Sequence, residues 1–174
     1  MVEEELQLTM DMDPNKLEIR QPYSAPLWWT VPPVSINRSM EAAVTNHNIN
    51  EVARPSACRI YTNGSGINGL VGSAAVSLNP STVRKAFMGT ATESSVPIAE
   101  LAGLILAFQI AEEPLFRGRD LEIYTDNQGA LQAVSNPRQA SGQYLVQRII
   151  DAIANWKHSW PNCTLHLYWI PAHG

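Results

Sequence analysis

Residues 121–128 read LEIYTDNQ and decide the fold of this chain. Apolar and polar side chains alternate along the run until a single carboxylate, Asp126, is followed by amides, a pattern typical of a strand that ends at a polar rim. Upstream, residues 58–62 form a second strand-like run before Asn63, and an apolar helical stretch between the two runs carries one acid, Glu100. Because the strand ends of an open α/β sheet gather polar side chains at one edge, we expect a shallow acidic site that suits hard divalent cations.

Size and charge favour one globular domain behind an acidic leading segment. The chain has 174 residues, 45% of them hydrophobic, and a formal net charge of -4. Residues 1–57 hold 8 acidic and 4 basic side chains, whereas residues 58–174 hold 8 of each. A neutral domain has no overall cationic field, so composition alone does not predict tight binding to nucleic acid.

Cysteine usage and the N-terminus favour an intracellular protein of the cytoplasm or nucleus. Cys58 and Cys163 lie in separate predicted strands, which is typical of reduced thiols packed as small apolar residues. The acidic N-terminus lacks the apolar centre of a secretory signal. No apolar run reaches the roughly 20 residues of a membrane helix. We therefore expect a soluble monomer without membrane association.

Residues 1–57 are predicted to form an extended, proline-rich arm or linker, with a short helix at residues 39–47. Prolines break any longer element, at Pro14, Pro22, Pro26, Pro32 and Pro33. The adjacent pair Trp28 and Trp29 is expected to dock on a surface, because exposed tryptophan pairs seldom stay without a partner.

Residues 58–174 are predicted to form an α/β domain. The expected strands and helices alternate in the order β-β-β-α-β-α-α-β, with strands at 58–62, 69–78, 83–89, 120–125 and 164–170 and helices at 96–112, 126–134 and 141–158. Three strands joined by short turns indicate an antiparallel meander, and strands that follow helices indicate parallel pairing. The pattern therefore predicts a five-stranded mixed sheet flanked by helices.

Four motifs carry a family resemblance: IYTNGSG from Ile60, AELAGL from Ala99, IYTDNQGAL from Ile123 and WIPAHG from Trp169. In this order and spacing they resemble a type-1 ribonuclease H domain, in the version attached to the reverse transcriptases of fungal, LINE-like retrotransposons. PLWWTVPP from Pro26 resembles the connector before that domain. The resemblance implies a ribonuclease H-like fold for residues 58–174 and other reverse transcriptase polyprotein domains as partners.

The resemblance also implies an activity and its residues. The family hydrolyses the RNA strand of RNA·DNA hybrids with two Mg²⁺ ions about 4 Å apart, and Mn²⁺ substitutes. By resemblance, Glu100 and Asp126 occupy two of the family's four acidic, metal-binding positions, and His173 matches a mobile-loop histidine that assists proton transfer or product departure. The family's contacts to the hybrid are matched by Gly64, Ser65 and Gln128.

Two departures from the family pattern predict weak or lost catalysis. Asn63 stands where the family has its first, metal-bridging aspartate, and an amide is neutral. The chain ends at Gly174, before the fourth acid and the closing helix, so we expect that helix to be missing. The edge beside the last strand is then expected to be open, with Trp28 and Trp29 as candidates to shield it.

Alternatives remain at this stage for the function and for single residues. The domain is either a degenerate nuclease, a non-catalytic scaffold that binds nucleic acid or protein, or a fragment without a selected function. Asn63 is either a natural loss, a deliberate substrate-trapping replacement, or a plain Asn-Gly turn residue. Asp126 alternatively caps a helix, and Glu100 alternatively lies on a helix surface. Two roles are left as alternatives, contact with phosphate groups or an ordinary solvated charge, for Arg84, Lys85, Arg117 and Arg119.

Overall fold

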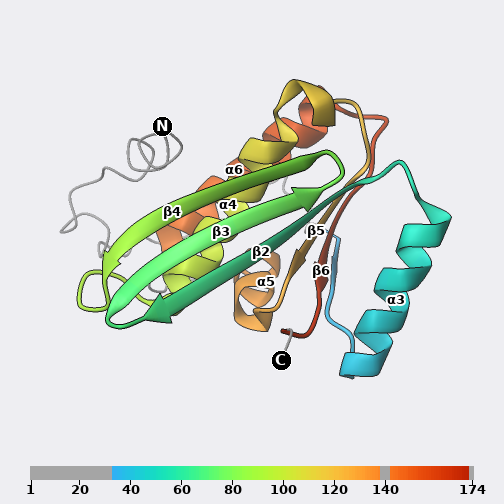
Figure 1. Cartoon of the computed structure of the whole chain (residues 1–174). Coiled ribbons are helices and arrows are strands. Elements are labelled where there is room, and N and C mark those ends of the chain that lie inside the picture. The colour runs from blue at the N-terminus through green and yellow to red at the C-terminus, as the bar shows by residue number, and fades with distance from the viewer. Residues whose placement is uncertain (1–32, 138–141, 173–174) are drawn as a thin grey trace.

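A computed structural model describes residues 33–137 and 142–172 of the chain. Figure 1 shows one twisted sheet with helices α4 (Val96–Ala111) and α6 (Gln143–Ser159) packed behind it. The six strands, in their order across the sheet, are β1 (Val34–Ser35), β6 (Leu165–Trp169), β5 (Leu121–Thr125), β2 (Cys58–Ile67), β3 (Leu70–Leu78) and β4 (Ser81–Thr90). The mixed sheet flanked by helices is confirmed, but the expected count of five strands is wrong because β1 adds a sixth.

Strands β2, β3 and β4 form the expected antiparallel meander. The first turn is Asn68-Gly69, where both residues have positive φ angles of 53° and 76°, as the favoured two-residue hairpin turn requires. Strand β2 therefore runs to Ile67, beyond the expected end at residue 62, and Asn63 lies inside it opposite Ala74. The interpretation of Asn63 as a turn residue is wrong, because the second Asn-Gly pair makes the turn.

Helix α4 is the centre of the core. Every residue from 99 to 108 is buried, since the helix lies between the sheet and α6. On its sheet side it packs against β2, β3 and β5, and Ile60, Ile123 and Leu167 of the sheet are fully buried in the same apolar cluster. This confirms the expectation that an almost wholly apolar helix is the buried one. Short helices η1 (Pro114–Phe116) and α5 (Gln128–Ser135) complete this layer.

The opposite face of β2, β5 and β6 is polar and aromatic. Tyr61, Tyr124 and Tyr168 lie in register on the three strands, and neighbouring rings stack with centroids 5.3 and 5.1 Å apart. Beside them the buried carboxylate of Glu122 forms ion pairs with Arg59 at 2.8 Å and Arg54 at 3.5 Å. Buried ion pairs of this kind hold their partners in one arrangement rather than adding much net stability.

Helix α3 (Met40–Ala53) packs on this polar face. His47 of the helix bonds to the hydroxyl of Tyr61 at 2.6 Å, and the Asn50 amide donates to Tyr124 at 3.4 Å. The helix begins at Ser39, whose hydroxyl accepts from the N–H of Ala42 at 3.1 Å. The short helix expected at residues 39–47 is thus present and longer than expected.

Strand β1 covers the edge of β6. It pairs with β6 in parallel, with Val34 opposite Leu167 and Ser35 opposite Tyr168. The edge expected to be open is therefore closed by the segment predicted to be an arm. Trp28 and Trp29 lie outside the described residues. In the part of the chain that the structure describes, no helix has the length and apolar character needed to cross a membrane.

The hydroxyl of Tyr124 should contribute measurably to stability. It donates to Glu122 at 3.2 Å and accepts from Asn50, all three within the buried network. Tyr124→Phe keeps the stacked ring but leaves both partners with one bond fewer, so we expect unfolding free energy to fall by about 1–2 kcal/mol. Urea denaturation followed by circular dichroism measures this, and a loss below about 0.5 kcal/mol contradicts the role given to the hydroxyl.

Candidate functional site

The predicted polar rim lies at the carboxyl ends of β2, β5 and β6. The three strands are parallel, and Thr62, Thr125 and Trp169 are neighbours across the sheet. Asn63 and Asp126 directly follow the first two of these residues, so they lie side by side on adjacent strands spaced about 4.8 Å apart. Asn63 is exposed and Asp126 is half-buried.

Helix α4 brings the third side chain to this rim. Glu100 lies near the start of α4 and is only 4% exposed. The helix approaches β2 at Gly64, where a side-chain Cβ would lie 2.6 Å from the Glu100 nitrogen and 3.0 Å from its Cδ. The main chain of Gly64 also hydrogen-bonds to the Glu100 carboxylate. Gly64 is therefore a packing requirement of the site, because only glycine permits this approach.

The Glu100 carboxyl is electrostatically unsatisfied. Burial is the main reason that the pKa of this carboxyl is raised from 4.5 to about 7. The nearby negative charge of Asp126 acts in the same direction, and the bond from Gly64 partly offsets both effects. One of its oxygens, Oε2, is buried without a hydrogen-bond partner among the described residues. The alternative of an ordinary helix-surface acid is thus wrong, since Glu100 is buried beside a second carboxylate.

Glu100→Gln should stabilise the protein above pH 7. The folded state holds a proton at pH values where the unfolded chain releases it, so the contribution of Glu100 to stability is greatest below pH 4.5, falls as the pH rises from 4.5 to 7, and is flat above. At pH 8 we expect the variant to gain about 2 kcal/mol over the parent and to lose this pH dependence. Urea unfolding at pH 5 and pH 8 measures both effects.

Glu112→Gln provides the matched control, because Glu112 is an exposed acid at the other end of α4. Its stability should follow the parent at both pH values. If Glu100→Gln and Glu112→Gln behave alike, the unfavourable burial assigned to the charged Glu100 carboxylate is wrong.

Asp126 does not cap helix α5, which was the alternative role considered for it from the sequence. Helix α5 is capped by Asn127, whose side-chain oxygen accepts from the N–H of Ala130 at 2.8 Å. Strand β5 ends at Thr125 and α5 begins at Gln128, so Asp126 lies one residue too early to cap the helix. The capping interpretation of Asp126 is wrong, which leaves its carboxylate available to the rim.

Sequence reasoning missed two residues that position Asp126. Asn127 fixes the start of α5 immediately after it, and the indole N–H of Trp169 donates to the Asp126 main-chain oxygen at 3.0 Å. An asparagine before a helix is a recognisable capping pattern, so the capping role of Asn127 could have been predicted from the sequence. The Trp169 contact joins positions 43 residues apart and has no local sequence signature.

The remaining residues predicted for the site either lie around this rim or fall outside the described residues. Ser65 is half-buried on β2 opposite Gly72, two residues beyond Asn63 and so on the same face of the strand. Gln128 is exposed in the first turn of α5. His173 lies outside the described residues. The structure therefore brings Glu100 and Asp126 near each other and places Asn63 beside Asp126 in the register of the sheet, with Ser65 and Gln128 further along the same segments.

The residues present fit a hard divalent cation, though with few ligands. Two carboxylates and the amide of Asn63 offer oxygen donors, and the unpartnered Glu100 Oε2 is an oxygen that a cation would satisfy. Mg²⁺ keeps several waters and needs only one or two carboxylates from a protein. Within residues 33–137 and 142–172, no group of three or more His, Cys, Asp or Glu side chains is placed to hold a metal ion.

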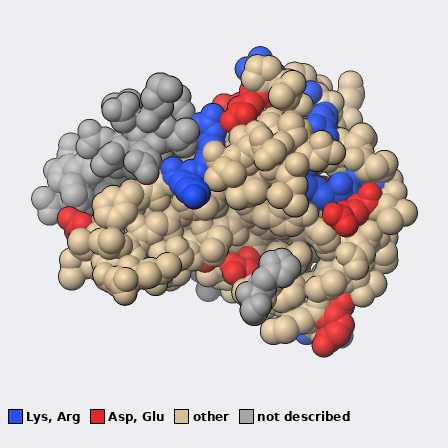
Figure 2. Space-filling model, in the orientation of Figure 1, with Lys and Arg blue, Asp and Glu red and all other residues tan. Residues whose placement is uncertain are grey.

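Three of the basic residues proposed for phosphate contact have partners within the protein. Arg84 pairs with Glu113 at 3.0 Å, Arg117 donates to the Glu112 carbonyl, and Arg119 donates to the Ser56 carbonyl. Figure 2 shows positive and negative side chains dispersed over the visible face rather than gathered into one basic surface. Ordinary structural charges are thus the better interpretation of these three arginines.

The sheet order and the helices on its faces define a ribonuclease H-like fold. The chain belongs to the Reverse transcriptase-like family, whose pattern it matches over residues 62–171. That span contains the whole rim from Asn63 to Gln128.

Solved structures are similar in fold but distant in sequence. Ribonuclease H1 from the halophilic archaeon Halobacterium salinarum NRC-1 has a TM-score of 0.50 and 14% identity, over 66% of this chain and 86% of that one. LC11-RNase H1 in complex with an RNA/DNA hybrid has a TM-score of 0.47 and 19% identity, over 66% and 85%. The N-terminal RNase H domain of a Mycobacterium tuberculosis protein has a TM-score of 0.48 and 15% identity, over 67% and 88%. No curated protein matches the chain.

Proposed function

We propose that this domain binds RNA·DNA hybrids and is a ribonuclease H whose Mg²⁺-dependent cleavage of the RNA strand is weak or lost. The observation that carries the proposal is the pair of carboxylates, Glu100 and Asp126, held together at the strand-end rim with one buried oxygen unpartnered. The family membership and the type-1 resemblance of its motifs add to it. A reverse transcriptase polyprotein of a retroelement is the proposed context.

Glu100 and Asp126 would hold Mg²⁺, and the bound cation would supply charge for an attacking water and a departing oxygen. Asn63 contributes at most a neutral oxygen, because the other end of an amide is an N–H donor that repels a cation. The rim therefore lacks one negative charge where a metal-bridging carboxylate would stand. Loss of preorganised charge in such sites costs orders of magnitude in rate.

Hybrid binding is proposed to use the polar neighbours of the rim. Ser65 on β2 and Gln128 on α5 offer hydrogen bonds to the minor groove, where 2′-hydroxyl groups distinguish RNA from DNA. Gly64 keeps the main chain close to α4, and a contact from it would use the backbone. His173 is proposed to assist product departure. Binding should be modest and only moderately sensitive to salt, because three of the candidate phosphate-binding arginines already have partners within the protein.

Fluorescence anisotropy with three labelled duplexes of one sequence tests the proposal. We expect the RNA·DNA hybrid to bind more tightly than the DNA duplex or the RNA duplex, and Mg²⁺ to strengthen binding to the hybrid. Asp126→Asn should remove the effect of Mg²⁺ but not the preference for the hybrid. Equal affinity for all three duplexes contradicts hybrid recognition.

A non-catalytic hybrid-binding module is the second candidate, and the neutral Asn63 at the rim favours it. Gel analysis of the same hybrid in Mg²⁺ and then Mn²⁺ separates the two functions. Slow cleavage that Asp126→Asn abolishes indicates a weak nuclease. Binding without cleavage in either metal indicates the module.

A further inference from the structure

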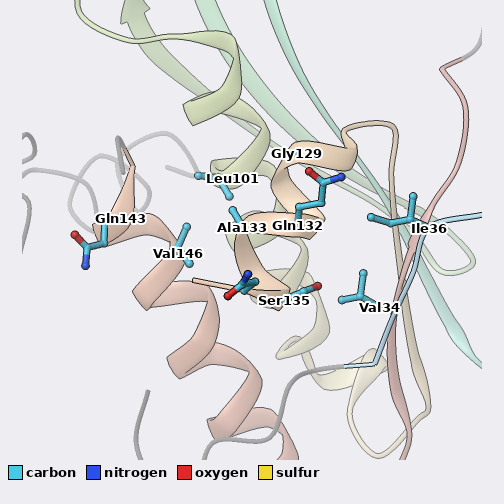
Figure 3. Close-up of a pocket in the computed structure, with 10 residues that line it drawn as sticks. Val34, Ile36, Leu101, Gly129, Gln132, Ala133, Ser135, Gln143 and Val146 are labelled. Atoms are coloured by element: carbon cyan, nitrogen blue, oxygen red, sulfur yellow. The ribbon is translucent and has the colours of Figure 1, made fainter. Parts of the chain in front are cut away.

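An apolar pocket of about 690 Å³ lies between helices α5 and α6 and the segment that carries β1. Figure 3 shows its lining side chains converging from these elements and from α4. The apolar part of the wall is made by Val34, Ile36, Leu101, Ala133 and Val146. We propose that Trp28 and Trp29, from the N-terminal segment of the same chain, occupy this pocket.

The connection of the chain places these tryptophans at the pocket. Val34 on β1 and Ile36 just beyond it both line the wall, so the described chain starts at the pocket's edge. Trp29 lies five residues before Val34, and five residues span at most about 18 Å. Pro32 and Pro33 favour an extended course over this distance. Either indole can therefore reach the pocket without any rearrangement of β1.

The pocket's chemistry suits indole rings. An apolar wall gains from covering by large aromatic side chains, and a buried indole N–H needs a hydrogen-bond acceptor. Gln132 and Ser135 of α5 line the same pocket and offer acceptor oxygens at its wall. The volume lies within the range of pockets that enclose ligands of several rings, so it has room for both side chains.

Other undescribed segments offer poorer occupants. Residues 138–141 read RQAS and residues 173–174 read HG, so neither stretch has a large apolar side chain. The apolar residues near the N-terminus, such as Leu6 and Leu8, are separated from β1 by more than twenty further residues. Trp28 and Trp29 are the aromatic side chains nearest to the pocket's edge in the undescribed sequence.

Thermal unfolding of the full chain tests the docking. The double variant Trp28→Ala/Trp29→Ala should melt about 5 °C or more below the parent, because the pocket wall becomes exposed. Leu6→Ala/Leu8→Ala removes apolar side chains of the same segment and should leave the melting temperature unchanged. An unchanged melting temperature for the tryptophan variant overturns the proposal.

Hydrogen exchange locates the effect. The tryptophan variant should lose amide protection at the pocket wall, in residues 129–135 of α5 and 143–146 of α6, while β3 and β4 keep theirs. Loss of protection confined to elements away from the pocket overturns the assignment of this pocket as the docking site.

A double-mutant cycle shows whether the two sides interact. Ala133→Glu places a charge in the pocket and should lower the melting temperature much as the tryptophan variant does. Combining both should lower it little further than the larger single effect, whereas additive losses overturn the contact. Size-exclusion chromatography completes the test: a parent dimer that the tryptophan variant abolishes would show docking into a second copy, and that result overturns docking within one chain.

Discussion

Asn63→Asp is expected to raise the rate of RNA cleavage in an RNA·DNA hybrid by about 100-fold or more in Mg²⁺. Asn63 and Asp126 follow Thr62 and Thr125, which are partners on adjacent strands, and the Glu100 carboxylate on α4 lies near Asp126. A third carboxylate there would add the negative charge that the rim lacks for holding divalent cations, and the exposed position of Asn63 lets the isosteric replacement fit without repacking. Initial rates on an end-labelled hybrid, at saturating Mg²⁺ and then Mn²⁺, measure the gain.

Asn127→Asp is the matched control for this prediction. It adds the same charge beside Asp126 and preserves the cap of α5, because aspartate caps helices as well as asparagine does. Its cleavage rate should stay at the parent's level. If Asn63→Asp cuts no faster than Asn127→Asp, the rim lacks more than the charge at Asn63, and the degenerate-nuclease proposal gives way to the binding module.

Gly64→Ala is expected to cost about 3 kcal/mol or more of unfolding free energy, the largest stability loss predicted for a single methyl group in this chain. The new Cβ would lie 2.6 Å from the Glu100 nitrogen and 2.8 Å from the Ala99 carbonyl carbon. Both are backbone atoms of a buried helix, so no side-chain rotation relieves the contact. The helix must shift away from β2, which also moves Glu100 out of the rim.

Gly72→Ala tests the same change on the neighbouring strand. A Cβ there meets the Ala86 oxygen at 3.5 Å, an ordinary contact, so its cost should stay below about 1 kcal/mol. Urea unfolding of both variants gives the comparison. Equal stability of the two variants contradicts the close approach of α4 to Gly64, because only that approach separates them.

The sequence predicted the elements of the fold correctly where a local hydrophobic pattern marks the segment that is buried. The apolar run of α4, with Glu100 as its one acid, indicated both the core helix and a carboxylate held within it. The alternation in β5 indicated the rim at Asp126 for the same reason. In both elements the apolar side chains that cause burial are visible as a pattern in the local sequence.

The missed elements depend on distant partners. Strand β1 has two residues and exists only because β6 pairs with it, so no periodicity announces it. Helix α3 extends past the expected end because its inward side chains, such as His47, Asn50 and Arg54, are polar and match the tyrosines and Glu122 of the sheet. Hydrophobic spacing cannot find a helix whose buried face is polar.

In the candidate site, too, some features were predicted from the local sequence and others depend on distant partners. Asn63, Glu100 and Asp126 were identified from strand ends and motif resemblance, whereas the close approach at Gly64 and the anchoring of Asp126 by Trp169 required the packed structure. A glycine in a strand has several possible reasons, and only the helix lying above it distinguishes close approach from a turn.

The parallel pairing of β1 with β6 also has a mechanical consequence. These two strands are the first and last of the described chain, and they lie side by side in the same direction. A force applied to the chain before β1 and after β6 loads this pair in shear, so its hydrogen bonds must break together rather than one after another. With only two residues in register, the first yield point under tension should come at low force and release β1 before the β2–β3–β4 meander unfolds.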